Sequence, residues 1–319
     1  MFKNSKVVVA GGSGFVGVNL IRRLLELGAK VTATLHKKAA VVDDDTVTYV
    51  QCDLTREEDC ARVFQGADYV FMCAANTSGA AVMEKTPLVH VTPNVVMNTL
   101  ALEAAYSAGV KKFLFISSNT VYPDVDHPVI EDEMMSGELF EKYYCVAWMK
   151  RFSEILCRMY AEKIKKPMMT VVVRPANIYG PFDDFEWATS HVVPALIRKV
   201  VERHDPIEVW GDGSDIKDLI YIDDFIEGIL LAMEKLDRYD PINIATGRPC
   251  SIKDVLRTIL DIDGYAHANI AFDTSKPTMI PKRLIDVTKA KSVLGFEART
   301  SIDEGIQKTV QWYRESRLS

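Results

Sequence analysis

The sequence predicts an α/β fold in which a doubly wound parallel sheet is followed by a smaller C-terminal α/β lobe. Short runs rich in β-branched and aromatic residues alternate with segments of helical periodicity through the first half of the chain. A glycine-rich turn follows the first of these runs. Strand–helix–strand units of this kind place the strands parallel, with helices on both faces of the sheet.

The expected elements follow a regular order over the first half of the chain. Strands are expected over residues 6–11, 30–35, 47–52, 68–74, 112–117 and 169–175, with helices between most of them. After about residue 176 the pattern is irregular. It predicts helices over residues 190–204, 222–236 and 301–316, and strands near 208–211, 219–222 and 242–246. We therefore expect a sheet domain over residues 1–175 and a smaller lobe over residues 176–319, with the chain crossing back to the sheet near residues 205–247.

The composition is that of an ordinary globular protein, because 319 residues with 48% hydrophobic side chains are enough for a sizeable core. A net charge of −6, without a long block of lysine and arginine, argues against nucleic-acid binding. No apolar stretch approaches the ~20 residues of a membrane span. Since a strand-like run begins by residue 6, we expect no signal peptide, no membrane partner and a cytoplasmic location. Six scattered cysteines indicate reduced core thiols, with no disulfide and no metal site.

Three glycines, Gly11, Gly14 and Gly17, separate the first strand-like run from the first helix. Glycine at this spacing permits a tight turn, close approach of the backbone to a pyrophosphate and close helix packing, and the helix N-terminus favours the anion. The trio has the strand–glycine–helix context that such a site requires. We therefore predict that the N-terminal domain is a Rossmann domain that binds a dinucleotide.

The end of the second strand favours NADP(H) over NAD(H). It reads TATLHKK and has no Asp or Glu that would accept hydrogen bonds from a ribose 2′-hydroxyl. His36, Lys37 and Lys38 instead offer positive charge where a 2′-phosphate would lie. The alternative is that they are solvated loop cations.

Motifs along nearly the whole chain resemble the extended short-chain dehydrogenase/reductase family, which includes NAD-dependent epimerases and dehydratases. Besides the glycine turn, the matching motifs are CDL at 52–54, CAAN at 73–76, SSNTVYP at 117–123, RPANIYGP at 174–181 and WGDGSDIKDLIYIDD at 210–224. The second half is most similar to GDP-L-fucose synthase-like nucleotide-sugar reductases and epimerases, through SHVVPALIRK, DTSKP and PKRLIDVTKAKSVLGFEARTS. The resemblance implies NADP(H) as cofactor, a nucleotide diphosphate sugar as substrate and a homodimer.

The resemblance also implies which residues contact these molecules. Asp53 is expected near the adenine and Asn94 near the cofactor. Further cofactor contacts are expected from Phe15, Val16, Leu54, Ala74, Ala75, Pro175 and Ile178. Substrate contacts are expected from Asn177, His191, Lys199, Trp210, Lys217 and Lys282. The lysines among them are either partners of a diphosphate or plain surface charge.

Two residues have the chemistry of a reductase active site. Ser118 follows the fifth strand, where a hydroxyl at the C-terminal edge of a parallel sheet can hydrogen-bond a substrate oxygen, although it can also serve as a cap. Lys150 lies within a helix and is expected to bind nicotinamide ribose and lower the pKa of a nearby phenol, unless it is an ordinary exposed lysine. An acid tyrosine usually stands four residues before such a lysine. That position holds Val146.

Two nearby tyrosines are candidates for the acid. On an ideal helix a residue seven before Lys150 returns to within about 20° of its face, whereas a residue six before lies about 120° away. The geometry therefore favours Tyr143 over Tyr144, although Tyr143 lies farther along the axis than Val146. An irregular helix start would favour Tyr144. A third interpretation makes both tyrosines structural, with water or another group as the acid.

Departures from the GDP-L-fucose synthase-like pattern limit which reactions the protein is expected to catalyse. Members that epimerise use a cysteine and a histidine as base and acid; His191 matches the histidine, but Thr120 stands at the cysteine position. A threonine hydroxyl is a poor base for a carbon acid, which disfavours epimerisation at C3 and C5. We expect reduction of a nucleotide-bound 4-keto-6-deoxyhexose. A 4-epimerase, a 3,5-epimerase and a catalytically silent dinucleotide-binding regulator remain as alternatives.

Overall fold

The centre of the protein is a seven-stranded sheet in which every pairing is parallel. The computed structural model describes residues 1–76, 86, 88–276 and 278–317. The strands, in their order across the sheet, are β11 (Ile242–Ile244), β6 (Met169–Pro175), β5 (Lys112–Ile116), β4 (Tyr69–Met72), β1 (Lys6–Ala10), β2 (Lys30–Leu35) and β3 (Thr48–Gln51). The order reverses between β1 and β4, which is the doubly wound arrangement. The predicted fold class is confirmed.

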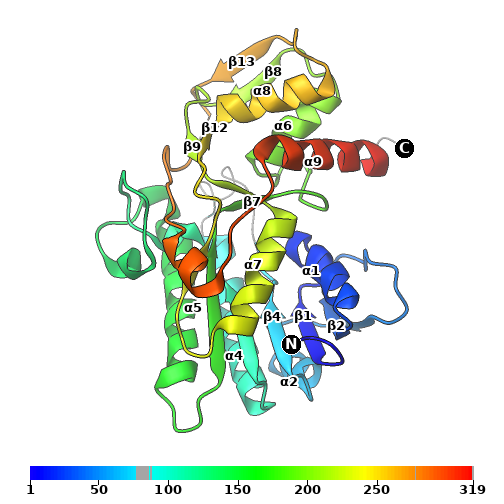
Figure 1. The fold of residues 1–319 in the computed structure, drawn as a ribbon, viewed down its shortest axis with the longest axis vertical. Coiled ribbons are helices and arrows are strands. Elements are labelled where there is room, and N and C mark those ends of the chain that lie inside the picture. The colour runs from blue at the N-terminus through cyan, green and yellow to red at the C-terminus, as the bar shows by residue number, and fades with distance from the viewer. Residues whose placement is uncertain (77–85, 87, 277, 318–319) are drawn as a thin grey trace.

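Helices cover both faces of the sheet (Figure 1). On one face lie α1 (Phe15–Glu26) and α7 (Ile222–Lys235), and on the other lie α2 (Glu57–Phe64), α4 (Leu88–Ser107) and α5 (Tyr144–Glu162). Successive side chains of a strand point to opposite faces. In β1, Val7 and Val9 accordingly join the core under α1 and α7, whereas Val8 and Ala10 join the core under the other three helices.

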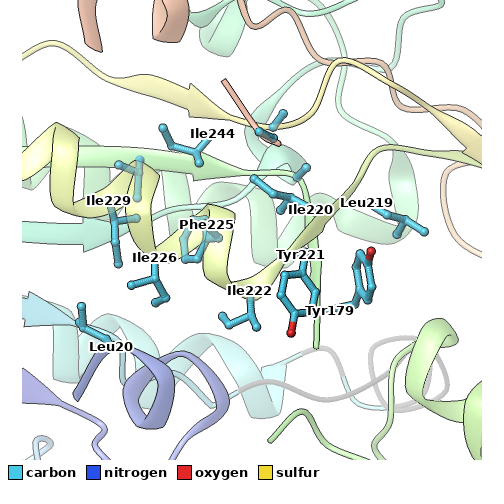
Figure 2. Close-up of a cluster of buried hydrophobic side chains, with 14 of the residues drawn as sticks. Leu20, Tyr179, Leu219, Ile220, Tyr221, Ile222, Phe225, Ile226, Ile229 and Ile244 are labelled. Carbon is cyan, nitrogen blue, oxygen red and sulfur yellow. The ribbon is translucent and has the colours of Figure 1, made fainter. Parts of the chain in front are cut away.

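The chain returns to the sheet after a long excursion. From β10 (Leu219–Tyr221) it runs directly into α7 and then into β11, which pairs with β6. Figure 2 shows apolar side chains of α7, among them Phe225 and Ile229, lying between Leu20 of α1 and Ile244 of β11. The side chain of Ile244 would touch any Cβ added at Gly228 of α7, so this helix and strand approach closely. The sheet is thus completed by residues from far along the sequence.

The C-terminal lobe lies above the sheet in Figure 1. It holds the helices α6 (Val192–Val201), α8 (Ile252–Asp263) and α9 (Ile302–Arg317), and the parallel pair β8 (Ile207–Trp210) and β13 (Ile270–Asp273). Two more small pairs connect it to the sheet: β7 (Asn177–Tyr179) with β10, and β9 (Ile216–Lys217) with β12 (Cys250–Ser251). The division at residue 175 stays a prediction, because the chain passes between the two parts more than once.

Candidate active site

The glycine turn has the close backbone contacts that a pyrophosphate cradle needs. Gly11 has φ +89°, a left-handed conformation that favours glycine, and an added Cβ would lie 2.7 Å from the backbone of Ala74. A Cβ on Gly17 would collide with the carbonyl oxygen of Gly11. Gly14 caps α1 without a side chain, and the first turn, which begins with Phe15 and Val16, carries no acidic residue. The first backbone N–H groups of the helix therefore favour an anion, and these residues fit a dinucleotide pyrophosphate.

The candidate 2′-phosphate residues are exposed at the end of β2. His36, Lys37 and Lys38 are all solvent-accessible there. The His36 ring lies 4.0 Å from the carboxylate of Asp53, which with Leu54 follows the neighbouring strand β3. Hydrogen bonds from Thr55 hold the pKa of Asp53 below its usual value. This edge of the sheet thus carries a carboxylate and exposed basic side chains, and their contacts with a cofactor stay a prediction.

The turn after β4 is fixed by a buried amide. The Asn94 side chain accepts a hydrogen bond from the backbone N–H of Asn76 and donates to the carbonyls of Asn76 and His90. It is 2% exposed. Asn94 therefore acts on the backbone just after Ala74 and Ala75, and holds that segment beside the glycine turn. A direct contact of Asn94 with the cofactor stays a prediction.

Lys150 reaches the C-terminal edge of the sheet from α5. Its ammonium donates to the carbonyl of Ile116, the last residue of β5, at 2.8 Å. Burial lowers its pKa to about 8, and the carboxylate of Glu154, one turn later, opposes that shift. Ser118 follows β5 by two residues and is half-buried. Ser118 and Lys150 therefore lie at the same edge as the glycine turn, because the strands are parallel.

A buried polar network lies directly beneath this pair. Ser117 hydrogen-bonds Glu154, and Arg174 of β6 pairs with the same carboxylate at 2.6 Å. The Arg174 guanidinium also donates to the Tyr122 hydroxyl at 3.0 Å, which in turn donates to Asn243 of β11. Glu154 and Arg174 are 0% and 2% exposed at their side chains. This network ties β5, α5, β6 and β11 together below the site.

The two candidate tyrosines point to different parts of the molecule. α5 begins at Tyr144, and Tyr143 is its N-cap residue after a short 3-10 turn. Tyr144 is 54% exposed and packs edge-on against Trp148 on the outer face of α5. Tyr143 is half-buried, and its phenol faces the lobe, near the backbone of Ile280 and the charges of Arg283 and Asp215. The structure therefore directs Tyr143, and not Tyr144, inward.

Burial raises the pKa of Tyr143 to about 12, with Arg283 opposing the shift and Asp215 adding to it. Lys150 is not among these influences, so its expected lowering of the phenol pKa is absent from this arrangement. Val146, at the usual tyrosine position, is half-buried. Tyr143 therefore keeps its proton near neutral pH, and its hydroxyl can donate that proton.

The predicted substrate residues divide into those already bound within the protein and those that are accessible. The ammonium of Lys217 is buried against Asp215 and the carbonyl of Ile280, and that of Lys199 donates to the carbonyl of Glu208. Trp210 is 40% exposed. Asn177 and His191 are exposed, Lys282 is half-buried, and Pro175 and Ile178 line the junction of β6 and β7. Surrounding protein lowers the pKa of His191, which favours its neutral ring.

Asp183, a residue that the sequence did not single out, is buried in the loop after β7. One carboxylate oxygen accepts from the N–H of Asp184 and the other has no partner. Burial raises the Asp183 pKa to about 7. The neighbouring Pro181 carbonyl accepts from Asn19 of α1, so this loop bridges the cofactor side and the lobe. The motif NIYGPFDDF gave no signal for a buried carboxyl, because adjacent aspartates are usually solvated.

Across the described ranges, no cluster of three or more His, Cys, Asp or Glu side chains is arranged to hold a metal ion. None of the helices in the described part of the chain is long and apolar enough to cross a membrane.

A glycine cradle at α1, with a serine and a buried lysine at the same edge of a doubly wound sheet, defines a dinucleotide-dependent enzyme of the dehydrogenase type. The model of the NAD dependent epimerase/dehydratase family matches residues 7–245. The chain belongs to this family, as its motifs predicted.

Individual relatives span nearly the whole chain. It is 29% identical to GDP-L-fucose synthase of Escherichia coli, over 98% of this chain and 97% of that one. It is 27% identical to dTDP-4-dehydro-6-deoxy-D-allose reductase of Streptomyces bikiniensis, over 97% and 96% of the two chains. Its structure is similar to UDP-glucose 4-epimerase of Thermotoga maritima, solved with UDP-glucose, with a TM-score of 0.88, 27% identity and coverage of 98% and 99%.

Proposed function

We propose that the protein is an NADP-dependent nucleotide-sugar oxidoreductase that reduces a nucleotide-bound 4-keto-6-deoxyhexose. The observation that carries the proposal is the edge of the sheet itself, where the glycine cradle, Ser118 and the ammonium of Lys150 lie together. The reductase relatives, and the nucleotide sugar bound to the similar epimerase, support a nucleotide sugar as substrate.

The residues present fit NADP(H), which when bound supplies the hydride. Ser118 donates a hydrogen bond to the keto oxygen and orients it. Tyr143 delivers the proton to that oxygen from the lobe side of the site. Lys150, whose ammonium is held at Ile116, supplies positive charge beside the ribose and the developing alkoxide.

The experiment mixes the protein with NADPH and a panel of GDP-, UDP-, CDP- and dTDP-linked 4-keto-6-deoxyhexoses, and follows NADPH absorbance. Consumption with one of them supports a reductase. The same nucleotide sugars with a 4-hydroxyl group in place of the keto group, mixed with the oxidised cofactor, test the 4-epimerase alternative: their interconversion at C4 without net change in the cofactor indicates it. Tight binding without any turnover indicates the silent regulator, which the valine at position 146 would suit.

The proposal includes little or no epimerisation at C3 or C5, because Thr120 stands where a thiolate base would be needed. His191 then contacts the sugar without a partner base. Turnover in deuterated water followed by NMR of the product tests this: deuterium at C3 or C5 above the uncatalysed background would contradict it and favour the 3,5-epimerase alternative.

NADP(H) is expected to bind at least about tenfold more tightly than NAD(H), which corresponds to ~1.4 kcal/mol. The reason is the exposed charge of His36 and Lys37 beside the position of the 2′-phosphate. Calorimetric titration of both cofactors measures the difference. Lys37→Gln should weaken NADP(H) alone, whereas Lys166→Gln, an exposed lysine in the loop after α5, should change neither. Equal affinities in the parent would show that these cations are only solvated loop charges.

Turnover is expected to fall as the pH rises above about 8. Lys150 has a lowered pKa of about 8, so above this pH it loses the positive charge that the site uses. Tyr143, with a pKa of about 12, does not titrate in that range. In Lys150→Arg the charge persists at high pH, so the falling limb should disappear even if turnover is lower overall. If turnover of Lys150→Arg still falls above about pH 8, the fall is due to the titration of another group.

We propose that the protein is a homodimer through the outer face of α4 and α5. A shallow apolar groove there is lined by Leu88, Val91, Val95, Cys145, Trp148, Met149 and Phe152. Ile155 and Met159 extend the exposed apolar surface along α5. Such a continuous apolar face is typical of an interface between copies. A cytoplasmic location likewise stays a proposal.

Phe152→Lys is expected to raise the dimer dissociation constant by about 100-fold or more, because two symmetric charges would be buried at the interface. Phe272→Lys is the control: Phe272 is 42% exposed, against 43% for Phe152, but lies on β13 in the lobe. Sedimentation over a dilution series measures both. A monomeric parent, or equal effects of the two substitutions, would contradict the proposed interface.

A further inference from the structure

Thr120 makes two hydrogen bonds to the hydroxyl oxygen of Ser118. Its backbone N–H donates to Ser118 Oγ at 3.1 Å. Its own hydroxyl donates to the same oxygen at 3.0 Å. Both side chains are half-buried, at the start of the short 3-10 turn that follows β5. The two residues form one hydrogen-bonded unit at the edge of the site.

The number of donor and acceptor sites on a hydroxyl determines which further hydrogen bond Ser118 can form. A serine hydroxyl has one hydrogen to donate and two lone pairs that accept. Thr120 occupies both lone pairs, one with its N–H and one with its O–H. With both bonds in this direction, the Ser118 oxygen is filled as an acceptor, and its hydrogen is left for an acceptor other than Thr120, such as a substrate oxygen. A hydroxyl that accepts a bond from another hydroxyl is also a stronger donor, because the two bonds polarise each other.

The neighbouring polar groups do not compete for that hydrogen. The adjacent Ser117 is buried and turned toward Glu154. The amide of Asn119 is directed to the carbonyl of Pro175 at 3.0 Å and to Asn177. With valine at position 146, no phenol stands four residues before Lys150 to share the substrate oxygen. The donor on the Ser118 side of the site is thus Ser118 itself.

We propose that Thr120 is a positioning residue that orients Ser118 as a hydrogen-bond donor to the substrate's keto oxygen. This role rests on the proposed reductase function and deepens it. A threonine is a poor base for a carbon acid, so Thr120 does not deprotonate the sugar in this proposal. It acts through Ser118. The proton that finally neutralises the alkoxide is not supplied by this pair, which only holds and polarises the oxygen.

Thr120→Val tests the role, because valine keeps the shape and the backbone N–H and removes only the hydroxyl. We expect kcat to fall about tenfold, the size of one well-placed hydrogen bond, with NADPH affinity unchanged. Thr120→Ser restores the hydroxyl and should stay within about threefold of the parent. Thr120→Ala, which removes the hydroxyl with less bulk, should match Thr120→Val; thermal unfolding and NADPH titration verify that each variant is folded.

A double-mutant cycle with Ser118→Ala completes the test. If Thr120 acts through Ser118, then Thr120→Val should change kcat by less than about twofold once Ser118 is alanine. Equal losses in both backgrounds would overturn the proposal, as would a Thr120→Val variant as active as the parent. If the parent itself reduces none of the keto sugars, the proposed function fails, and this role fails with it.

Discussion

Replacing Tyr143 by phenylalanine is expected to lower turnover by ~10²-fold or more while cofactor affinity barely changes, since general acid catalysis typically contributes 10²–10⁴. Tyr143 is the tyrosine that the start of α5 turns inward, beside Arg283 and Ile280 of the lobe. Its raised pKa keeps the proton on the phenol until the alkoxide forms. Steady-state kinetics with the best keto sugar, and NADPH titration by fluorescence, measure the two quantities.

Tyr144→Phe is the matched control, because it removes the same hydroxyl one residue later from an exposed ring that contacts Trp148. It should retain nearly full turnover. If Tyr144→Phe is inactive and Tyr143→Phe is active, the assignment of the acid is reversed. If both variants are active, water or another group is the acid, and the contact of Tyr143 with the lobe is only structural.

Glu154→Gln is expected to destabilise the protein by about 3–5 kcal/mol, because it leaves the buried guanidinium of Arg174 without its carboxylate. This is a large part of the ~5–15 kcal/mol that stabilises a typical domain. The substitution also removes the charge that opposes the lowered pKa of Lys150. The high-pH limb of the activity profile should therefore move to a lower pH. Denaturant unfolding and the pH profile measure the two effects.

The exposed pair of Arg158 and Glu162, on the same helix, supplies the control. Its nitrogen and oxygen lie 2.9 Å apart, but the side chains are 58% and 34% exposed. Glu162→Gln should cost less than about 1 kcal/mol, because water already solvates both charges. Similar losses in the two variants would mean that burial does not decide the contribution of these ion pairs.

Local sequence was sufficient for most of the sheet. Most strands of the N-terminal half are rich in β-branched and aromatic residues, and the strand predicted over residues 242–246 is β11. Several elements of the second half were not predicted, among them β7, β13 and α8. β7 is only three residues long and is defined by its pairing with β10, some forty residues later. α8 had a readable signal that was overlooked: Ser251 and Asp254 form a capping box at its start.

Site residues whose conformation depends on a local turn could be predicted from the sequence. Contacts that only the tertiary fold creates could not. Gly11, Gly17 and Ser118 depend on local turns, so their motifs were informative. Lys217 was predicted to bind a diphosphate, but its ammonium is paired with the carbonyl of Ile280, which only the tertiary fold brings near. The pKa of Tyr143 is raised mainly by burial against the lobe, which also depends on the tertiary fold. No spacing rule could give these contacts.

The late return of α7 and β11 has a consequence for synthesis of the protein. When Pro175 leaves the ribosome, β6 is still an open edge, and the apolar side of α1 has no helix beside it. About seventy further residues must follow before β11 can pair with Val173, Arg174 and Pro175 of β6 and close that edge. An unpaired parallel edge is prone to wrong association. During synthesis there is therefore an interval in which most of the N-terminal sheet can form but the β6 edge is still unpaired and open to association with other chains.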